Sequence, residues 1–508
     1  MTLPRFALPS IRRVARLPGA RAAAGIDALL VVAPPGGSTL LERLPEAGRW
    51  RALHERAPAR AQQARGTSLA NDRQTRAILG HARDTATPYQ RLELAGRMLR
   101  ELGELQPARI AIAVAPEFSD CAGWYQALIA AVLAWNHEPP AFRSKPTPPH
   151  RLRTLDLHLA PPLDLARITA SARGTNLVRH LTALPPNVLD AGGYRRLLGE
   201  LARRHGLRLR WYPERRLRQL GCGAFLAVAR GNAARDAGIA RLSWGGRGGR
   251  GAAVSLVGKG ILFDTGGANL KPHRHMLDMH TDMAGSAVAL ATLIALAELK
   301  APVAAEAWLA ITENNIGPRA YRPQEVVRAA NGTTIQVIHT DAEGRMALAD
   351  TLVLAARARP RLLVDFATLT GSCIQALTER YSGVFARDPQ LAERAHRAGA
   401  ASGERVWPFP IDEDFDTDID SKIADVKQCT VDSKGDHILA ARFLGRFVPD
   451  DIPWLHVDLA SATRSGGLAH VAEDITGFGV RFALALLLDE PAAPARRPRR
   501  APARRRRP

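Results

Sequence analysis

Lysine is scarce in this 508-residue chain, which has seven lysines against 63 arginines. Cysteine is scarcer still, and the four cysteines, Cys121, Cys222, Cys373 and Cys429, lie far apart without forming a CxxC pair. This spacing excludes a cysteine-built metal site and is typical of proteins from a reducing compartment. The chain also lacks a run of about eighteen apolar residues, the length that crosses a membrane. We therefore expect no membrane span and no membrane partner.

Positive charge is concentrated at the two ends of the chain. The net charge is +21, but residues 1–65 hold eleven arginines against four acidic residues, and residues 491–508 hold eight arginines and no acid. The ends thus supply +15 and leave about +6 for the rest. A solvated arginine-rich surface explains this pattern, and binding of nucleic acid or an acidic partner by the ends is the alternative. Residues 491–508 cannot bury apolar surface, so we predict a disordered tail.

The first third of the chain predicts a small domain. Residues 1–24 are rich in Arg, Ala and Pro, and we expect a flexible basic N-terminus. Arg12 and Arg13 precede apolar residues as in a twin-arginine export signal, but Asp27 interrupts the apolar stretch, so we predict a cytoplasmic protein. Residues 25–165, starting with an apolar strand at 28–33, alternate strand-like and helix-like segments, which predicts an α/β domain.

Residues 170–490 predict a larger α/β domain in which helices flank a central mixed sheet. The expected strands are a run ending at 264 and the runs 303–312, 334–339, 361–367 and 454–459, and the expected helices are 283–299, 346–359 and 475–488. The segment GGRGGRG at 245–251 is too short for an RNA-binding Arg-Gly box. We predict that it is a flexible connection between two strands of a hairpin.

Two polar loops in this domain follow strand-like runs. The apolar run 254–263, which Gly258 and Gly260 break, ends in Asp264, and the run 334–339 leads into TDAEGR at 340–345. Functional groups gather beyond the carboxyl ends of strands in open α/β sheets. Because alternate residues of an extended segment face the same way, Asp341 and Glu343 are expected to converge.

The two loops and the start of the helix at 283–299 contribute four carboxylates, Asp264, Asp282, Asp341 and Glu343. Their mutual repulsion in one crevice requires cations, and divalent metals are the usual solution. Two of the seven lysines, Lys259 and Lys271, lie in the same stretch. An ammonium beside a metal can become a neutral amine and bind it, which a guanidinium cannot do. The sequence therefore predicts a metal centre.

These motifs resemble the leucyl aminopeptidase (cytosol aminopeptidase) family of dinuclear metallopeptidases. The ordered set is NLVRHLTALPPNVL (176–189), VGKGILFDTGGANLKP (257–272), DMAG (282–285), ITENNIGPRAYRPQEVV (311–327), HTDAEGR (339–345), DFATLTGSC (365–373) and DLASAT (458–463). The resemblance covers roughly residues 170–480. It implies a homohexameric exopeptidase that releases N-terminal amino acids, leucine-like ones preferred, from peptide substrates by means of a metal-activated water.

The resemblance also implies roles for individual residues. Asp264 and Glu343 would bridge two divalent ions, Mn or Zn, while Asp341 completes the ligands of the first ion and Lys259 with Asp282 those of the second. The two family positions that act on the substrate are matched by Lys271, which would stabilise the developing oxyanion, and Arg345, which would bind a bicarbonate acting as general base.

Other positions match the substrate pocket or depart from the family. Met279, Thr368 and Gly371 match positions that line the pocket. Ala284 stands where the family usually has the first of two glycines after Asp-Met, and His339 stands where it has an asparagine on the leaving-group side. We expect metal binding to survive both changes, whereas the effect of His339 on specificity stays open.

Three other interpretations are weaker. The turn Phe263-Asp264-Thr265-Gly266 is similar to that of aspartic proteases, but those enzymes need two such turns and the chain has one. His273, His275 and His280 have spacing that can bind zinc, yet the carboxylates already form a full ligand set, so we predict that these histidines line the cleft. The alternative of another class is a DNA-binding accessory or regulatory protein that uses the basic ends, with or without peptidase activity.

Overall fold

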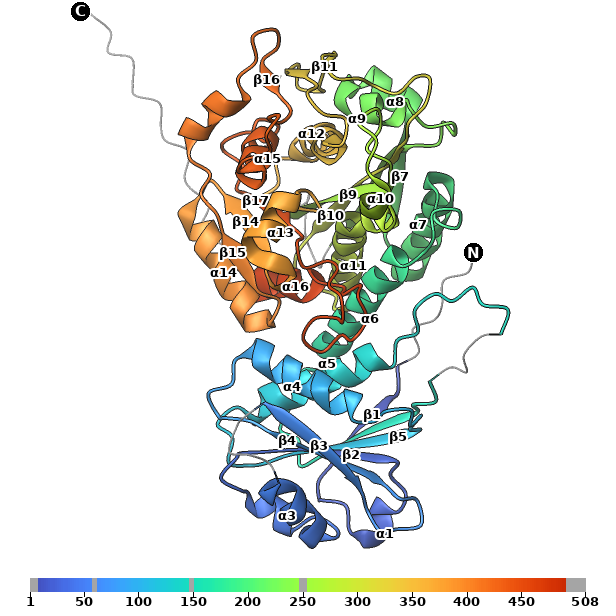
Figure 1. The fold of residues 1–508 in the computed structure, drawn as a ribbon, viewed down its shortest axis with the longest axis vertical. Coiled ribbons are helices and arrows are strands. Elements are labelled where there is room, and N and C mark those ends of the chain that lie inside the picture. Colours follow the sequence, from blue (N-terminus) through green and yellow to red (C-terminus); the bar gives the residue numbers. More distant parts are fainter. Residues whose placement is uncertain (1–7, 57–61, 146–149, 246–253, 490–508) are drawn as a thin grey trace, which may run out of the picture.

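The computed structural model describes residues 8–56, 62–145, 150–245 and 254–489, which form two parts, one built on each large sheet (Figure 1). The first part has a six-stranded sheet in the order β1-β6-β5-β2-β4-β3. Neighbouring strands run parallel except β3 and β4, which are antiparallel. The strands are β1 (Ser10–Val14), β2 (Ala28–Ala33), β3 (Gln63–Ser68), β4 (Arg76–His81), β5 (Arg109–Val114) and β6 (Thr154–His158).

Helices cover both faces of this sheet. In Figure 1, α4 and α5 lie on the side that faces the second part, and α1 and α3 lie on the opposite side. The helices are α1 (Ala20–Ala23), α2 (Thr39–Glu42), α3 (Ala47–Glu55), α4 (Pro88–Arg100) and α5 (Cys121–Trp135). The predicted apolar strand 28–33 is β2, and all of its residues are buried.

The prediction of a flexible N-terminus is wrong for residues 10–14, which form the edge strand β1 beside β6. Asp156 on β6 is fully buried and forms ion pairs with Arg12 at 2.8 Å and with Arg109 at 2.6 Å. A buried carboxylate requires such partners, so an arginine-rich strand is stable at this edge. Local composition could not reveal this, because the partner is 144 residues away.

The second part has a mixed sheet, as the sequence predicts, and its eight strands have the order β15-β14-β17-β13-β9-β10-β8-β7. The central strands β17, β13, β9 and β10 are mutually parallel. The strands are β7 (Arg208–Pro213), β8 (Gly238–Trp244), β9 (Val254–Asp264), β10 (Ala305–Asn314), β13 (Leu362–Ala367), β14 (Ser382–Ala386), β15 (Val406–Pro408) and β17 (Trp454–Asp458). A small third sheet contains β11 (Val326–Arg328), β12 (Thr334–Gln336) and β16 (Val426–Lys427).

Two apolar cores enclose the large sheet, one on each face. Leu256 and Leu262 of β9 belong to the core under α11, whereas Val257 and Ile261 belong to the core under α12. Strands buried on both faces explain the nearly continuous apolar runs in the sequence. The helices are α6 (Leu165–Thr182), α7 (Ala191–His205), α8 (Glu214–Gln219), α9 (Gly223–Ala229), α10 (His273–Met276), α11 (Ala284–Glu298), α12 (Glu343–Ala356), α13 (Gly371–Leu377), α14 (Pro389–Ser402), α15 (Asp436–Gly445) and α16 (Val480–Leu488), with the 3-10 turns η1 (Met279–Thr281), η2 (Thr378–Arg380) and η3 (Glu413–Ile419).

Several element boundaries differ from the predictions, and the helix expected at 346–359 is α12 (Glu343–Ala356). The expected strand 334–339 is shortened to β12, which ends at Gln336, and the chain then enters an irregular loop. The expected helix 475–488 begins only at Val480, because Gly477 and Gly479 have φ values of +69° and +119°, outside the helical region.

One helical stretch of the described chain, His273–Glu298, is apolar and long enough to cross a membrane, but 83% of its apolar window is buried inside the protein. This stretch is therefore a helix of the protein core.

The first part has an apolar core of its own, separate from the two cores of the second part. The division into residues 25–165 and 170–490 stays a prediction, and β1 adds residues 10–14 to the first part. The segments 246–253 and 490–508 lie outside the described residues, so the predictions of a hairpin connection and a disordered tail stay predictions.

Candidate metal centre and active site

Asp264 is the last residue of β9 and lies at the carboxyl edge of the sheet, opposite Asn314 at the end of β10. Its Oδ1 accepts hydrogen bonds from Asn314 Nδ2 at 2.7 Å and from Gly266 N at 2.8 Å. Gly266 has a φ of +86°, and a Cβ there would lie 2.4 Å from the carbonyl oxygen of Asn269. The turn after β9 therefore requires glycine and fixes the Asp264 carboxylate in one orientation.

Glycine also lets α11 approach the sheet, which places Asp282. A Cβ on Gly258 would lie 2.5 Å from Ser286 Cα, and a Cβ on Gly285 would lie 2.1 Å from the carbonyl oxygen of Phe366. Gly258 therefore interrupts the apolar run without ending the strand, and it allows α11 to pack against β9. Ala284 is buried and fits beside Gly285, so the departure at this position leaves the contact intact.

Asp341 and Glu343 lie close to the other carboxylates, but not because they are alternate residues of an extended segment. Asp341 lies in a turn that Thr340 ties to the loop after β9, since Thr340 Oγ1 donates to the Gly266 carbonyl at 2.6 Å. Glu343 is the first residue of α12. The prediction of an extended segment is wrong, because the chain turns at 340–342 and the start of a helix brings Glu343 into the crevice.

The structure brings the four carboxylates and two lysines together. Oxygen atoms of Asp264, Asp341 and Glu343 lie within 4.8 Å of one another. Lys259 Nζ lies 2.8 Å from Asp282 Oδ2 and 3.0 Å from Glu343 Oε1. Lys271 Nζ lies 2.9 Å from Asp264 Oδ2 and 2.5 Å from Asp341 Oδ1. Each ammonium thus joins two carboxylates from different loops.

The crevice is strongly charged and largely buried, although the side chains of Asp341 and Lys271 are 26% and 15% exposed. Burial first, and then the charge of Glu343, raise the pKa of Asp264 to about 7, and burial with the same charge raises the pKa of Asp282 to about 7 against the effect of Lys259. Burial alone would lower the pKa of Lys259, but the surrounding carboxylates raise it. Burial and mutual repulsion thus raise the proton affinity of Asp264 and Asp282.

The donor set fits divalent cations. Four carboxylates face two ammonium groups, so the ionised crevice carries an excess of negative charge in a buried place. Carboxylate oxygens are ligands for Mn and Zn, and an amine that loses its proton adds a nitrogen ligand. Among the described residues, no histidine joins the group of carboxylates. His273 and His275 lie exposed on α10, and His280 is half-buried in η1.

The predicted pocket residues lie around this centre to different degrees. The Thr368 hydroxyl donates to Asp282 Oδ1 at 2.7 Å, and the Thr368 carbonyl accepts from Lys259 Nζ at 2.9 Å. Met279 is half-buried in η1, which packs on β9. Gly371 begins α13 with open space where a Cβ would stand. His339 is half-buried two residues before Asp341, and burial, then the charge of Lys271, lower its pKa.

Arg345 is fully buried in the first turn of α12, and both its terminal nitrogens bind Asp436. The sequence reasoning did not select Asp436 or Asn314. The signal for Asn314 is a polar residue at the end of the apolar run 305–311, beside the strand that ends in Asp264. Asp436 gave no such signal, because it follows a polar loop far along the chain.

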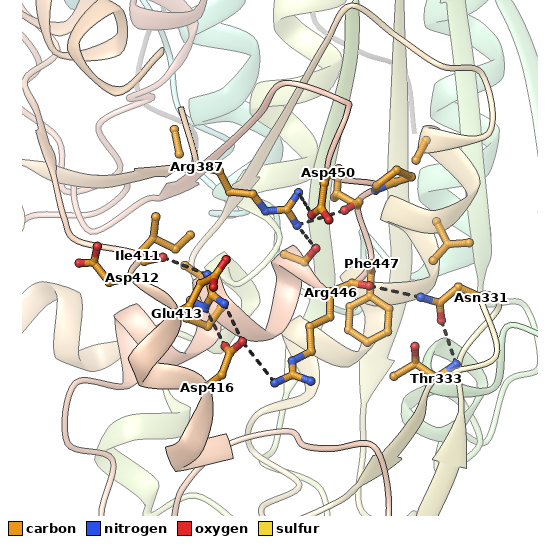
Figure 2. Close-up of a pocket in the computed structure, with 18 of the residues that line it drawn as sticks. Asn331, Thr333, Arg387, Ile411, Asp412, Glu413, Asp416, Arg446, Phe447 and Asp450 are labelled. Atoms are coloured by element: carbon orange, nitrogen blue, oxygen red, sulfur yellow. Dashed lines mark hydrogen bonds and ion pairs between the residues drawn. The ribbon is translucent and has the colours of Figure 1, made fainter. Parts of the chain in front are cut away.

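A cleft of about 1410 Å³ lies elsewhere. Its lining includes residues near the C-terminal end of α12. That end of the helix lies about 20 Å from Glu343, which begins the helix. Figure 2 shows its charged walls paired with one another, Arg387 with Asp450 and Arg446 with Asp416. None of the predicted site residues lines it, so cleft size alone would point to the wrong place.

By fold and site, the protein falls in the class of α/β proteins with a carboxylate-lined crevice that could hold divalent cations. The cytosol aminopeptidase family, catalytic domain, matches residues 176–484. Since this match covers more than half of the chain, the chain belongs to the cytosol aminopeptidase family.

Named relatives support this membership. The chain is 41% identical over 318 residues to a probable cytosol aminopeptidase of Methylobacterium radiotolerans, which is 62% of each chain. It is 38% identical over 358 residues to one of Roseiflexus castenholzii, covering 68% of this chain and 73% of the relative. The first alignment thus spans less than two thirds of that relative's length.

Two solved structures share the fold over nearly the whole chain. A mutant of tomato leucine aminopeptidase has a TM-score of 0.84 at 25% identity, covering 95% of this chain and 97% of that one. The bottromycin maturation enzyme BotP in complex with Mn has a TM-score of 0.80 at 30% identity, covering 91% and 98%. The two-part α/β architecture is therefore that of the leucine aminopeptidase fold.

Proposed function

We propose that this protein is a metal-dependent aminopeptidase that removes the first residue, leucine-like ones preferred, from peptides. The observation that carries the proposal is the buried group of four carboxylates and two lysines at the carboxyl edge of the large sheet. Family membership and the names of the relatives support it. A cytoplasmic homohexamer is part of the proposal and rests on the same resemblance.

The chain's own residues would hold the metals. Asp264 and Glu343 are central in the group and would bridge two ions, Asp341 would bind one of them, and Lys259 with Asp282 the other. Two divalent ions, Mn or Zn, supply an activated water and polarise the scissile carbonyl when bound. The Mn in the related bottromycin enzyme makes Mn the first metal to try. Lys259 would have to give up its proton to bind, which is possible for an amine but not for a guanidinium.

Lys271 would act on the substrate. Its side chain is 15% exposed, whereas that of Lys259 is 4% exposed, so Lys271 faces the open side of the crevice. The carboxylates of Asp264 and Asp341 keep it charged and fix its ammonium group. A fixed ammonium stabilises the negative charge that develops on the carbonyl oxygen. Met279, Thr368 and Gly371 would line the pocket for the first side chain, and His339 would lie on the leaving-group side.

The test is hydrolysis of leucine amide and leucyl dipeptides with added Mn or Zn. We expect activity in the parent, and a loss of about 100-fold or more in kcat for Lys271→Ala, because an oxyanion donor is removed. Asp341→Asn should lower both activity and bound metal, since an amide is a weaker ligand than a carboxylate.

Lys434→Ala is the matched control, because the Lys434 side chain is 87% exposed and, among the described residues, forms its ion pair with Asp432 at the surface. It should keep parental activity. A folded parent that binds metal but hydrolyses no leucyl substrate with any divalent ion would overturn the proposal.

A further inference from the structure

The anion site of Arg345 is already filled by the protein. Arg345 Nη1 donates to Asp436 Oδ1 at 2.9 Å and Nη2 donates to Asp436 Oδ2 at 2.7 Å, a two-pronged pair between a guanidinium and a carboxylate. Nη1 also donates to the Gln428 carbonyl at 3.0 Å. The guanidinium is fully buried, and the Asp436 side chain is 17% exposed. The pair therefore presents its carboxylate, not its cation, to the accessible side.

Asp436 is held firmly in this position. It is the first residue of α15, where the helix dipole favours a negative charge. The next residue anchors the turn, because His437 N donates to Ser372 Oγ at 2.9 Å. The loop before α15 is tied to the loop of Asp341, since Gln428 Oε1 accepts from Ile338 N at 2.7 Å. Asp436 and the metal-centre loop thus belong to one rigid arrangement.

A bicarbonate on Arg345, which the family resemblance implies, does not fit this arrangement. It would have to displace a carboxylate that the chain itself holds beside the guanidinium, and a tethered group has a large advantage in effective concentration. A second anion would also approach four carboxylates in the same crevice. The sequence-based expectation of bicarbonate at Arg345 is therefore not supported by the structure.

We infer that Asp436 replaces this bicarbonate, so that the chain carries its own carboxylate on Arg345 and needs no added bicarbonate for peptide hydrolysis. The inference rests on the proposed aminopeptidase function. An oxygen of Asp436 takes a proton from the attacking water as the carbon–oxygen bond forms. The same proton passes to the peptide nitrogen as the carbon–nitrogen bond breaks, which leaves Asp436 ionised for the next cycle.

The first experiment measures bicarbonate binding and requires no hydrolysis. The purified full chain, Asp436→Ala and the control Asp432→Ala are titrated with sodium bicarbonate in a sealed calorimeter, with sodium chloride as the salt control. Asp432 lies in the same loop with its side chain 57% exposed, so its loss should change nothing. We expect binding only to Asp436→Ala, where the guanidinium is vacated. Bicarbonate binding by the parent, or none by a folded Asp436→Ala, would overturn the inference.

The second experiment measures peptidase activity in buffers freed of carbon dioxide. The parent and Asp432→Ala should change less than twofold when bicarbonate is added. Asp436→Ala should lose at least tenfold in kcat and recover part of it with bicarbonate or formate, because either restores a carboxylate on Arg345. A purely structural role for Asp436 would give a loss without rescue, and that result would refute the base role.

Two further results separate this inference from a folding defect of Asp436→Ala and from a failure of the proposed function. Asp436→Asn keeps the shape of the side chain but cannot accept a proton as a carboxylate does. It replaces Asp436→Ala in the activity measurement if Asp436→Ala does not fold. It should be as inactive as Asp436→Ala. If the parent proves inactive with every metal while only Asp436→Ala binds bicarbonate, the proposed function fails and the assignment of Asp436 to the anion site stands.

Discussion

At the scale of single residues, the metal centre depends on glycines as much as on carboxylates. A Cβ on Gly344 would lie 2.5 Å from Lys259 Cε and 2.7 Å from its Nζ. Gly344 follows Glu343 directly, so the helix that supplies one carboxylate also leaves the space for the lysine. Lys259 itself lies between two strand glycines that leave room for α11.

Gly344→Ala should therefore disturb the centre while leaving every ligand in place. The added methyl overpacks a rigid site, which costs about 1–3 kcal/mol, and should displace the Lys259 amine. We expect less than the full two metal ions per chain by elemental analysis and a lower unfolding midpoint in urea. Gly48→Ala is the control, because nothing lies within 4 Å of a Cβ at this helical position. It should raise stability by roughly 0.5–1 kcal/mol, and equal metal content in both variants would contradict the argument.

At the scale of elements, a buried ion pair joins the two strands beneath the site. His456 on β17 stands opposite Asp365 on β13, and its Nδ1 lies 2.6 Å from Asp365 Oδ1. Trp454 Nε1 donates to the other oxygen of Asp365 at 2.7 Å. Burial would lower the pKa of His456, but Asp365 and Asp458 raise it against the opposing charge of Arg345.

This pair should make stability depend on pH. A histidine whose pKa is raised in the folded state stabilises the fold fully below its unfolded pKa of about 6.5, and this contribution is lost as the pH rises through the folded value. We expect Asp365→Asn to lower the free energy of unfolding by about 3 kcal/mol at pH 5.5 and by less at pH 9. Urea unfolding at both pH values measures this difference. Glu393→Gln, which removes an exposed helical pair, should cost under about 1 kcal/mol at either pH.

The same elements show how far sequence reasoning reaches. Apolar runs located β9, β10, β13, β17 and α11, and the polar residues beside β9, α11 and the run 334–339 supplied all four carboxylates. The pairing between distant segments was out of reach, because Asp436 meets Arg345 across 91 residues and Asn314 meets Asp264 across 50. The arginine-rich edge strand β1 was missed for the same reason, since its stability comes from Asp156.

At the scale of the whole molecule, the described site takes no residue from the arginine-rich ends. All the predicted ligands and Arg345 lie between 259 and 345, and Asp436 follows at 436. The relatives' printed names give no support to the DNA-binding alternative, and residues 491–508 lie outside the described chain. The basic ends and the metal centre are therefore expected to be separable.

Deletion of residues 491–508 tests this separation. We expect unchanged hydrolysis of leucyl peptides and a mass of six chains by light scattering, for both the parent and the shortened protein. If the ends bind nucleic acid, the parent should be retained on immobilised DNA and the shortened protein should not. If the ends only form a solvated surface, neither protein should be retained. A loss of activity or of the hexameric mass on deletion would show that the tail serves the enzyme itself.

The carboxylates that hold Lys259 and Lys271 also shield both amines from chemical modification. Acylating reagents attack accessible, uncharged amines, whereas Lys259 is buried, Lys271 is only 15% exposed, and both are kept charged. Lys434 is open to solvent, so dyes or activated resins would attach there before they reached the crevice. A protein this poor in lysine can therefore be labelled or immobilised at very few points, with the two amines of the crevice left intact.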